Sequence, residues 1–264
     1  MTSRIIQIDA FAEKPFEGNP AAVCWLREER PANWMQSVAS EMNLSATGFV
    51  RQLDKDYELR WFTPAYEIGL CGHATLASAH VMWTEEILER AQPIGFQTKS
   101  GLLTCKRVGE LVELNFPATA ATKAEADPRL FDALNVRPAF CGKSRFDYLL
   151  VVESEEIVRS LKPDFATLRA IPDIRGVIVT SPSQDSRYDF ISRFFAPGLG
   201  IDEDPVTGSA HCCLAPYWSA RLGKLSMTGF QASKRGGIVH VRLEGDRVVL
   251  GGKAITILRG ELAG

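Results

Sequence analysis

Two short segments hold the side chains best suited by type to chemistry. The first is Cys71-Gly72-His73, which places a thiol and an imidazole at the start of an apolar pattern of helical period. A helix N-terminus carries unpaired N–H groups and a partial positive charge. It therefore stabilises a thiolate at Cys71 and favours the neutral ring of His73, whose ordinary pKa lies near neutrality. His73 is a candidate acid or base. The alternative for His73 is that it caps the helix or packs beneath it. The alternative for Cys71 is a small buried thiol in a loop at the end of a strand.

The second segment is Glu203-Asp204-Pro205-Val206-Thr207-Gly208-Ser209, which also leads into a helical pattern. The proline restricts Asp204 to an extended backbone, so that its carboxylate could point toward a bound molecule. Ser209 supplies a hydroxyl beside the free N–H groups of a helix start, an arrangement that binds anions. The alternative is that the acids of this segment are solvated and simply favoured by the helix dipole.

These two segments belong to an internal repeat, and the repeat determines the predicted fold. Arg60-Trp61-Phe62-Thr63-Pro64 precedes the first segment, and Arg193-Phe194-Phe195-Ala196-Pro197 precedes the second. After the segments, Phe96-Gln97 resembles Phe230-Gln231, and alternating strand patterns follow both. Each predicted helix therefore lies between similar strands, as expected for two copies of one unit.

Each half also contains a strand, a helix and a second strand ahead of this repeat. The predicted elements are strands 21–26, 47–53, 148–152 and 175–180, and helices 33–42 and 164–170. We therefore predict an α+β fold of two pseudo-symmetric halves, each a β-sheet or barrel wrapped around a central helix. The halves cover 1–117 and 118–264, and the last strand, 254–262, returns to pack on the first half. Two helix N-termini that face each other across one cleft would bind a small carboxylate.

Composition excludes several classes of protein. Hydrophobic residues make up 45% of the 264 residues and charged residues 23%, which is typical of a globular chain. The net charge of −2 provides no basic excess for nucleic acid. No apolar run approaches the roughly 18 residues that span a bilayer, so no membrane partner is expected. The N-terminal segment does not resemble a signal peptide, so we expect a cytoplasmic protein with reduced thiols.

Motifs for metals and cofactors are also missing from the sequence. The six cysteines include no CxxC pair, and the four histidines form no HExxH pattern. There is no dinucleotide fingerprint, P-loop or GxSxG elbow. We therefore expect no metal and no cofactor. The roles of Cys71, Cys212 and Cys213 stay open, although a two-thiol racemase is disfavoured because Thr207 stands where its second thiol would be.

The motifs together resemble the PhzF-like isomerase family, which has the diaminopimelate-epimerase fold. The matching motifs are Gly18-Asn19-Pro20, Asn43-Leu44-Ser45, Arg60-Trp61-Phe62-Thr63-Pro64, Leu70-Cys71-Gly72-His73-Ala74-Thr75, Glu203-Asp204-Pro205-Val206-Thr207-Gly208-Ser209 and Arg235-Gly236-Gly237. The resemblance implies an active site between the two halves, a homodimer and no cofactor. It also implies that His73, Asp204 and Ser209 surround the substrate.

The sequence departs from this family at the catalytic position. The family's Asn-Leu-Ser motif continues with an essential glutamate, whereas this chain reads Ser45-Ala46-Thr47. A methyl group cannot transfer a proton, and the loss of a general acid/base typically costs about 10²–10⁴-fold in rate. Ala46 is either an engineered substitution, which we favour because the surrounding motifs are intact, or a natural change in a member with altered or lost chemistry.

The predicted function is a cofactor-independent isomerase or epimerase that moves a proton at carbon of a small carboxylate-bearing substrate, impaired in this chain by Ala46. The residues assigned to substrate binding are Asn19, Ser45, Gly72, Thr207 and Gly208. The alternative is a natural non-catalytic protein that binds a small molecule on the same scaffold. A hydrolase that used Ser209 or Ser45 with His73 would lack a nucleophile elbow.

Overall fold

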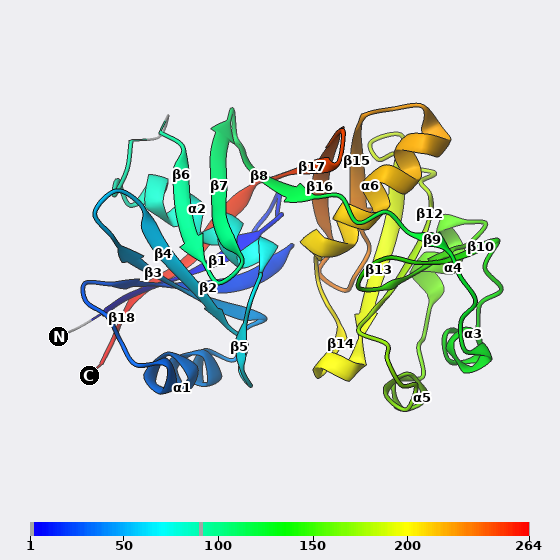
Figure 1. The fold of residues 1–264 in the computed structure, drawn as a ribbon, viewed down its shortest axis with the longest axis horizontal. Coiled ribbons are helices and arrows are strands. Elements are labelled where there is room, and N and C mark those ends of the chain that lie inside the picture. Colours follow the sequence, from blue (N-terminus) through cyan, green and yellow to red (C-terminus); the bar gives the residue numbers. More distant parts are fainter. Residues whose placement is uncertain (1–2, 90–91, 264) are drawn as a thin grey trace. The chain divides into compact units, whose positions relative to one another are not determined.

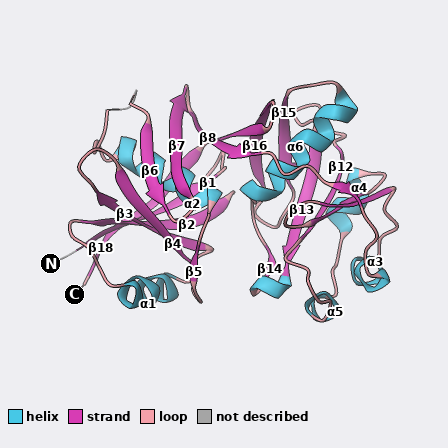
Figure 2. Cartoon of the chain, in the orientation of Figure 1, coloured by secondary structure: helices cyan, strands magenta, loops and turns pink. Residues whose placement is uncertain are grey.

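The computed structural model describes residues 3–89 and 92–263 (Figure 1). The chain divides into two compact units. Unit 1 contains the residues up to 115 together with those from 251 onward, and unit 2 contains residues 116–250. Both units contain strands and helices, so the predicted α+β class is confirmed (Figure 2).

Unit 1 is built on a sheet that the last strand of the chain completes. Its strands are β1 (Ser3–Ala10), β2 (Asn19–Leu26), β3 (Ala46–Gln52), β4 (Tyr57–Phe62), β5 (Glu67–Ile68), β6 (Ile94–Thr98), β7 (Gly101–Val108), β8 (Leu111–Pro117) and β18 (Ala254–Leu262). β18 pairs antiparallel with β1, and β1 pairs antiparallel with β2. β2 and β3 are parallel, β3 and β4 are antiparallel, and β4 is parallel to β6. The first and last strands of the chain therefore lie side by side.

Helix α2 (Gly72–Thr84) is the central helix of unit 1. Ten of its 13 residues are buried, which is the pattern of a helix enclosed on every side. It contacts β1, β2, β3 and β18. Small residues permit this close packing, because a Cβ added at Gly48 would lie 2.9 Å from Ser78 Oγ. Helix α1 (Ala32–Met42) instead packs one face, with Met35 and Ala39, against residues of β2, β3 and β4.

Unit 2 repeats this plan around helix α6 (Gly208–Leu222), which contacts β15 and β16 and ends at Gly223 in the left-handed region. Its strands are β9 (Thr122–Lys123), β10 (Phe140–Lys143), β11 (Tyr148–Val151), β12 (Val177–Pro182), β13 (Phe190–Ala196), β14 (Ile201–Glu203), β15 (Ser226–Gln231), β16 (Gly237–Glu244) and β17 (Arg247–Gly252). A 3₁₀ turn, η1 (Pro197–Leu199), precedes β14. Helix α3 (Pro128–Leu134) packs on a second apolar core. The connection from β11 to β12 contains two short helices, α4 (Glu155–Ser160) and α5 (Phe165–Arg169), where the sequence predicted only one.

The strand pairing and two ion pairs show the internal repeat directly. β2–β3 and β11–β12 are parallel, β3–β4 and β12–β13 are antiparallel, and β4–β6 and β13–β15 are parallel. The Arg60 guanidinium binds Glu67 at 2.8 and 3.0 Å, and Arg193 binds Glu203 at 2.7 and 2.8 Å. Each glutamate lies five residues before the start of its central helix. The predicted pseudo-symmetry is confirmed, and each Arg–Glu pair fixes the loop that enters a central helix.

One detail of the predicted repeat is wrong. When Arg60 is aligned with Arg193, the counterpart of Glu58 is Ile191. Glu58 pairs with Gln97 on the neighbouring strand, whereas Ile191 pairs with Phe230. The counterpart of Gln231 is therefore Thr98. A shift of one residue turns a side chain to the other face of a strand. Accordingly, Gln97 is exposed whereas Gln231 is fully buried.

Candidate active site

Thr207 links the loop before α6 to the Asp204 carboxylate. It is the N-cap residue of α6, but its hydroxyl does not cap the helix. The hydroxyl instead donates a 2.6 Å hydrogen bond to Asp204 Oδ2. His211, one turn into the helix, donates from its main-chain N at 3.3 Å and from its ring Nδ1 at 2.9 Å to the Thr207 carbonyl. Asp204 is thus held in one direction at the entrance to the helix.

Gln231, the last residue of β15, completes the support of this loop. Its Oε1 accepts a 2.9 Å hydrogen bond from the Thr207 main-chain N–H. Its Nε2 donates to the Asp204 carbonyl at 2.8 Å and to Thr207 Oγ1 at 3.2 Å. A fully buried amide requires such partners, because an unsatisfied polar group costs about 1–3 kcal/mol. The loop from 204 to 207 is therefore fixed in both its main chain and its side chains.

Ser209, the second residue of α6, contacts an ion pair in which the carboxylate is buried and the arginine is half-buried. Arg175 donates from Nη2 to Ser209 Oγ at 3.2 Å. The same guanidinium binds Asp147 through Nε at 2.8 Å and through Nη2. Burial raises the pKa of Asp147, and the neighbouring Arg175 opposes that shift. Gly176 leaves room for the pair, since a Cβ there would lie 2.9 Å from Asp147 Oδ1 and 2.3 Å from the Phe194 ring. A cation, a hydroxyl and an α-helix start that lacks a side-chain cap therefore adjoin one another.

The start of α2 carries a buried thiol beside a neutral imidazole. Cys71 is the N-cap residue and makes no side-chain cap. Its Sγ lies 3.5 Å from His73 Nδ1. Burial lowers the pKa of His73 to about 4, so its ring is uncharged at neutral pH. Thr75 donates from Oγ1 to the Cys71 carbonyl at 2.6 Å, which reproduces in unit 1 the contact between His211 and Thr207.

Ala46 is fully buried at the first position of β3. It lies opposite Ala21 on the neighbouring strand β2. Asn19, the first residue of β2, is also fully buried. The next residue of β3, Thr47, has a buried Oγ1 with no hydrogen-bond partner among residues 3–89 and 92–263. Position 46 is therefore desolvated.

The repeat gives Ser45 a counterpart in unit 2. With the strands in register, Ser45 is the counterpart of Arg175. Arg175 contacts Ser209, which is the counterpart of His73 at the second position of its helix. In unit 1, the strand β3 that begins at Ala46 contacts α2.

The residues assigned from the sequence fall into two groups. The group in unit 1 comprises Asn19, Ser45, Ala46, Gly72 and His73, and the group in unit 2 comprises Asp204, Thr207, Gly208 and Ser209. Within unit 2, a hydrogen bond joins Asp204 to Thr207. The Thr207 hydroxyl, which the sequence assigned to substrate binding, is engaged with Asp204 and Gln231.

Three polar residues beside the group in unit 2 escaped the sequence analysis: Gln231, Arg175 and Asp147. Gln231 follows Met227 and Gly229 on the buried face of β15, so the alternation could have marked it as a buried amide in need of partners. Arg175 and Asp147 are separated by 28 residues and lie in connections between elements. No local pattern shows that they meet.

The cysteines and the titratable clusters suggest no further chemistry. Within the two described ranges, no group of three or more His, Cys, Asp and Glu residues is arranged to hold a metal ion. All six cysteines are free. Burial raises the pKa of Cys212 and Cys213 to about 12, so both are neutral thiols packed inside α6. A search of the same residues finds no helix with the length and apolar character needed to cross a membrane.

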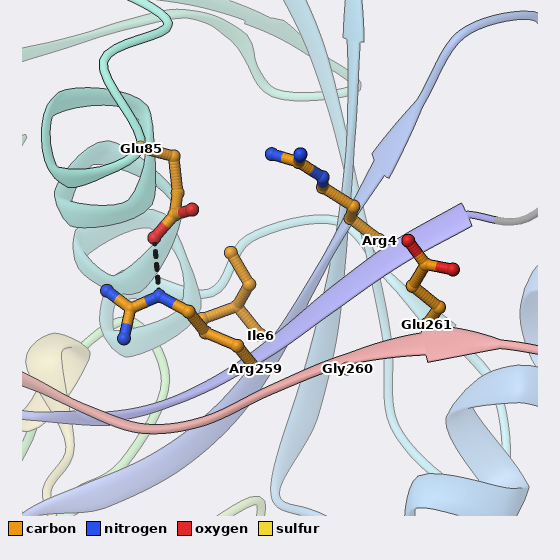
Figure 3. Close-up of a pocket in the computed structure, with 6 residues that line it drawn as sticks. All are labelled: Arg4, Ile6, Glu85, Arg259, Gly260 and Glu261. Carbon is orange, nitrogen blue, oxygen red and sulfur yellow. Dashed lines mark hydrogen bonds and ion pairs between the residues drawn. The ribbon is translucent and has the colours of Figure 1, made fainter.

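A separate pocket of about 340 Å³ lies in unit 1 where β1, β18 and the end of α2 meet (Figure 3). Its lining residues are Arg4, Ile6, Glu85, Arg259, Gly260 and Glu261. Arg259 Nε donates to Glu85 Oε1 at 2.9 Å, and the two arginines balance the two glutamates. The pocket contains none of the residues at the two helix starts, so we assign no chemistry to it.

Comparison with known proteins identifies relatives over the whole chain. A model of the PhzC-PhzF family, described as phenazine biosynthesis-like proteins, matches residues 8–260. An uncharacterized isomerase of Halalkalibacterium halodurans is 52% identical over 263 residues, covering 99% of each chain. The crystal structure of a PhzF-family protein from Enterococcus faecalis superposes with a TM-score of 0.95 at 40% identity, covering 100% of each chain.

More distant structures show the breadth of the fold. A probable proline racemase from Agrobacterium radiobacter superposes with a TM-score of 0.66 at 11% identity, covering 99% of this chain and 93% of its own. At that identity the likeness concerns the fold alone. The predicted diaminopimelate-epimerase-like architecture, with two β-wrapped helices, is therefore confirmed.

Proposed function

Because the chain belongs to the PhzC-PhzF family of phenazine biosynthesis-like proteins, we propose that its site is that of an isomerase or epimerase which moves a proton at carbon. The naming of a close relative as an isomerase supports this reaction class. The observation that carries the proposal is chemical: one buried central helix begins at a neutral histidine, and the other begins at a firmly held carboxylate. The substrate is a small molecule with a carboxylate, and the chemistry needs no cofactor.

Binding of the substrate carboxylate is assigned to the two helix starts. The N–H groups around Gly72 and Gly208 begin helices whose N-cap side chains do not cap them. Such groups bind anions well. In unit 2, Ser209 and the adjoining Arg175 add a hydroxyl and a charge-assisted donor.

Proton transfer is assigned to position 46. A glutamate there would occupy a site that is now fully buried, and desolvation would raise its pKa toward the working pH. It would take a proton from a carbon made acidic by conjugation and return it to another carbon or to the opposite face. His73 and Asp204 would orient the substrate and relay protons. The N–H groups of the helix starts would stabilise the developing enolate.

With alanine at position 46, this chain lacks the proposed base. We expect binding to persist and proton transfer to be impaired. If Ala46 is an engineered change, the parent protein is an active isomerase. The other assigned residues favour this explanation, since the contact of His73 in unit 1 and that of Asp204 in unit 2 are both present.

A second candidate function is a natural non-catalytic protein that binds a small carboxylate on the same scaffold. Ala46 itself is the observation that favours it, because the anion-binding groups of unit 2 do not depend on that residue. The codon for position 46 in the native gene distinguishes the two candidates. A glutamate codon supports the isomerase, and an alanine codon supports the binding protein.

Deuterium exchange tests the assigned roles. The Ala46→Glu variant is incubated in D₂O with small unsaturated hydroxy and amino acids, and NMR follows deuterium entering carbon positions. Adding His73→Gln or Asp204→Asn should lower the exchange rate by about 10²-fold or more. If neither addition slows exchange, the roles are wrong. Binding without exchange in every variant would favour the binding protein. Sizing by light scattering tests the homodimer that forms part of the same proposal.

A further inference from the structure

Gln231 lies next to Asp204, which the proposed function assigns to the substrate, without belonging to any predicted motif for catalysis. We infer that Gln231 is a positioning residue, which fixes the direction of the hydrogen bond from Thr207 to Asp204 and thereby holds Asp204 ready for the substrate. The inference rests on the proposed function, because it assigns Asp204 a task there. It concerns Gln231 and Thr207, which would act on the substrate only through Asp204.

The orientation of the Gln231 amide is set by two main-chain groups. Its Oε1 faces the Thr207 N–H, which can only donate, at 2.9 Å. Its Nε2 faces the Asp204 carbonyl, which can only accept, at 2.8 Å. A reversed amide would place two donors together and two acceptors together. The NH₂ group is therefore necessarily the one that lies 3.2 Å from Thr207 Oγ1.

This orientation determines what the Thr207 hydroxyl can do. Since the Gln231 NH₂ group has no acceptor lone pair, the hydroxyl must accept from it and must direct its own proton elsewhere. The acceptor of that proton is Asp204 Oδ2, at 2.6 Å. The chain of donors thus runs in one direction, from Gln231 through Thr207 to Asp204. Such a chain favours a single rotamer of the Asp204 side chain.

Comparison of the two units supports a joint role for these three residues. When α2 and α6 are aligned at their first residues, Asp204 corresponds to Ile68 and Thr207 to Cys71. In the strand register, the counterpart of Gln231 is Thr98. The acid and both residues that hold it therefore occur together in unit 2. None of the three is present at its counterpart position in unit 1.

The strand pair by itself does not require a glutamine at this position. A buried amide whose hydrogen bonds are all satisfied adds little to the free energy of unfolding. Thr98, at the counterpart position, closes its own turn by donating from Oγ1 to the Gly101 carbonyl. The strand pair of unit 1 forms without a glutamine at this place. The glutamine is thus specific to the unit that carries Asp204.

The variant Gln231→Glu tests the direction of the hydrogen bonds with little change of shape. The new carboxylate can still accept from the Thr207 N–H, but it cannot donate to the hydroxyl and instead attracts its proton. In the Ala46→Glu background, we expect the maximal rate of exchange to fall by about 10-fold or more, with the substrate concentration at half-maximal rate changed less than about threefold. Gln97→Glu, at an exposed glutamine, is the matched control and should leave both values unchanged.

Thr207 variants keep the inference testable if Gln231→Glu does not fold. Thr207→Val should lower the maximal rate as much as Gln231→Glu does, and Thr207→Ser should recover most of the loss. The double variant should be no slower than either single one, because both changes break the same chain of donors. Losses that multiply in the double variant, or a loss confined to substrate affinity, would overturn the inference.

A spectroscopic measurement separates this inference from the proposed function. The ¹³C chemical shift of the Asp204 carboxyl group, measured by NMR at neutral pH on the chain with Ala46, requires no activity. Gln231→Glu and Thr207→Val should both shift this signal, whereas Gln97→Glu should not. Shifts without exchange in any background would refute the proposed function alone. An unchanged signal in both variants would refute the positioning role itself.

Discussion

We expect the free energy of unfolding to fall by about 6 kcal/mol between pH 7.5 and pH 5, because three histidines, two of them buried and one half-buried, resist protonation. Burial lowers the pKa of His73, His80 and His211 to about 4. In the unfolded chain their pKa is near 6.5. The unfolded state therefore takes up protons over this range while the folded state does not. The equilibrium moves toward unfolding as the pH falls.

The magnitude follows from the two pKa values of each ring. A shift from about 6.5 to about 4 is worth about 2 kcal/mol at pH 5 and about 3 kcal/mol below both values. Three rings together give about 6 kcal/mol at pH 5, against a typical total of about 5–15 kcal/mol. The pKa of Asp185, lowered to about 2, reduces the free energy of unfolding only at a lower pH. The raised pKa of Asp147 works against the loss of stability as the pH falls.

Urea unfolding followed by circular dichroism at several pH values between 7.5 and 5 measures this effect. His80→Gln provides the specific check, because an amide can keep the hydrogen bond from His80 Nε2 to Thr256 Oγ1, now 3.1 Å long. The variant should lose about one third of the pH dependence. A free energy of unfolding that changes by less than about 1 kcal/mol over the range would refute the reasoning. An unchanged slope in His80→Gln would also refute it.

Three further predictions concern the two helix starts. The double variant Asp147→Asn/Arg175→Met should weaken binding of the substrate carboxylate by about tenfold, measured by NMR titration, because it removes the cation beside α6 without leaving a buried charge unpaired. Gly176→Ala should lower the free energy of unfolding, measured by urea unfolding, by about 1–3 kcal/mol. The control Gly69→Ala places no atom closer than 3.8 Å to its new methyl group and should change this free energy by less than about 0.5 kcal/mol. Cys71→Ser, made in the glutamate-restored chain, should leave deuterium exchange within about threefold, because the base is at another position.

Each of these predictions has a contrary outcome. Glu155→Gln/Arg159→Met removes a comparable pair, in which a largely buried carboxylate binds an arginine stacked over an aromatic ring. If that control weakens binding as much as the first double variant, the pair near Ser209 has no special part in binding. Equal effects of the two glycine variants would contradict the packing argument. Loss of exchange in Cys71→Ser would revive the thiol mechanism.

The architecture was largely predictable because it rests on local patterns that occur twice. The Arg60 and Arg193 motifs, each followed by a small-residue helix start, place α2 and α6 correctly and reveal the pseudo-symmetry. Gly223 ends α6 in the left-handed region as its residue type suggests. Side-chain direction was less predictable, and the match of Gln97 to Gln231 was off by one position. Sequence similarity over two residues cannot fix a strand register, whereas the hydrogen-bonded ladder does.

The candidate site was predictable only in part. The residues at the helix starts were found because a helix N-terminus gives polar side chains a recognisable local context. The contacts that hold them were not, since Arg175 meets Asp147 and Ser209 from distant parts of the chain. The Thr207 hydroxyl could equally have capped its helix. The buried amide of Gln231 decides between the two arrangements, because it donates to the Thr207 hydroxyl and so directs the hydroxyl proton to Asp204.

The central claim is that position 46 is the place of the proton-transferring group. Its most direct test is the rate at which deuterium enters carbon in D₂O, measured side by side for the present chain and for Ala46→Glu with the same carboxylate compounds. We predict that Ala46→Glu exchanges at least about 10²-fold faster, while both proteins unfold cooperatively and bind the compound. Equal rates of exchange in the two proteins would contradict the claim and place the base at another residue.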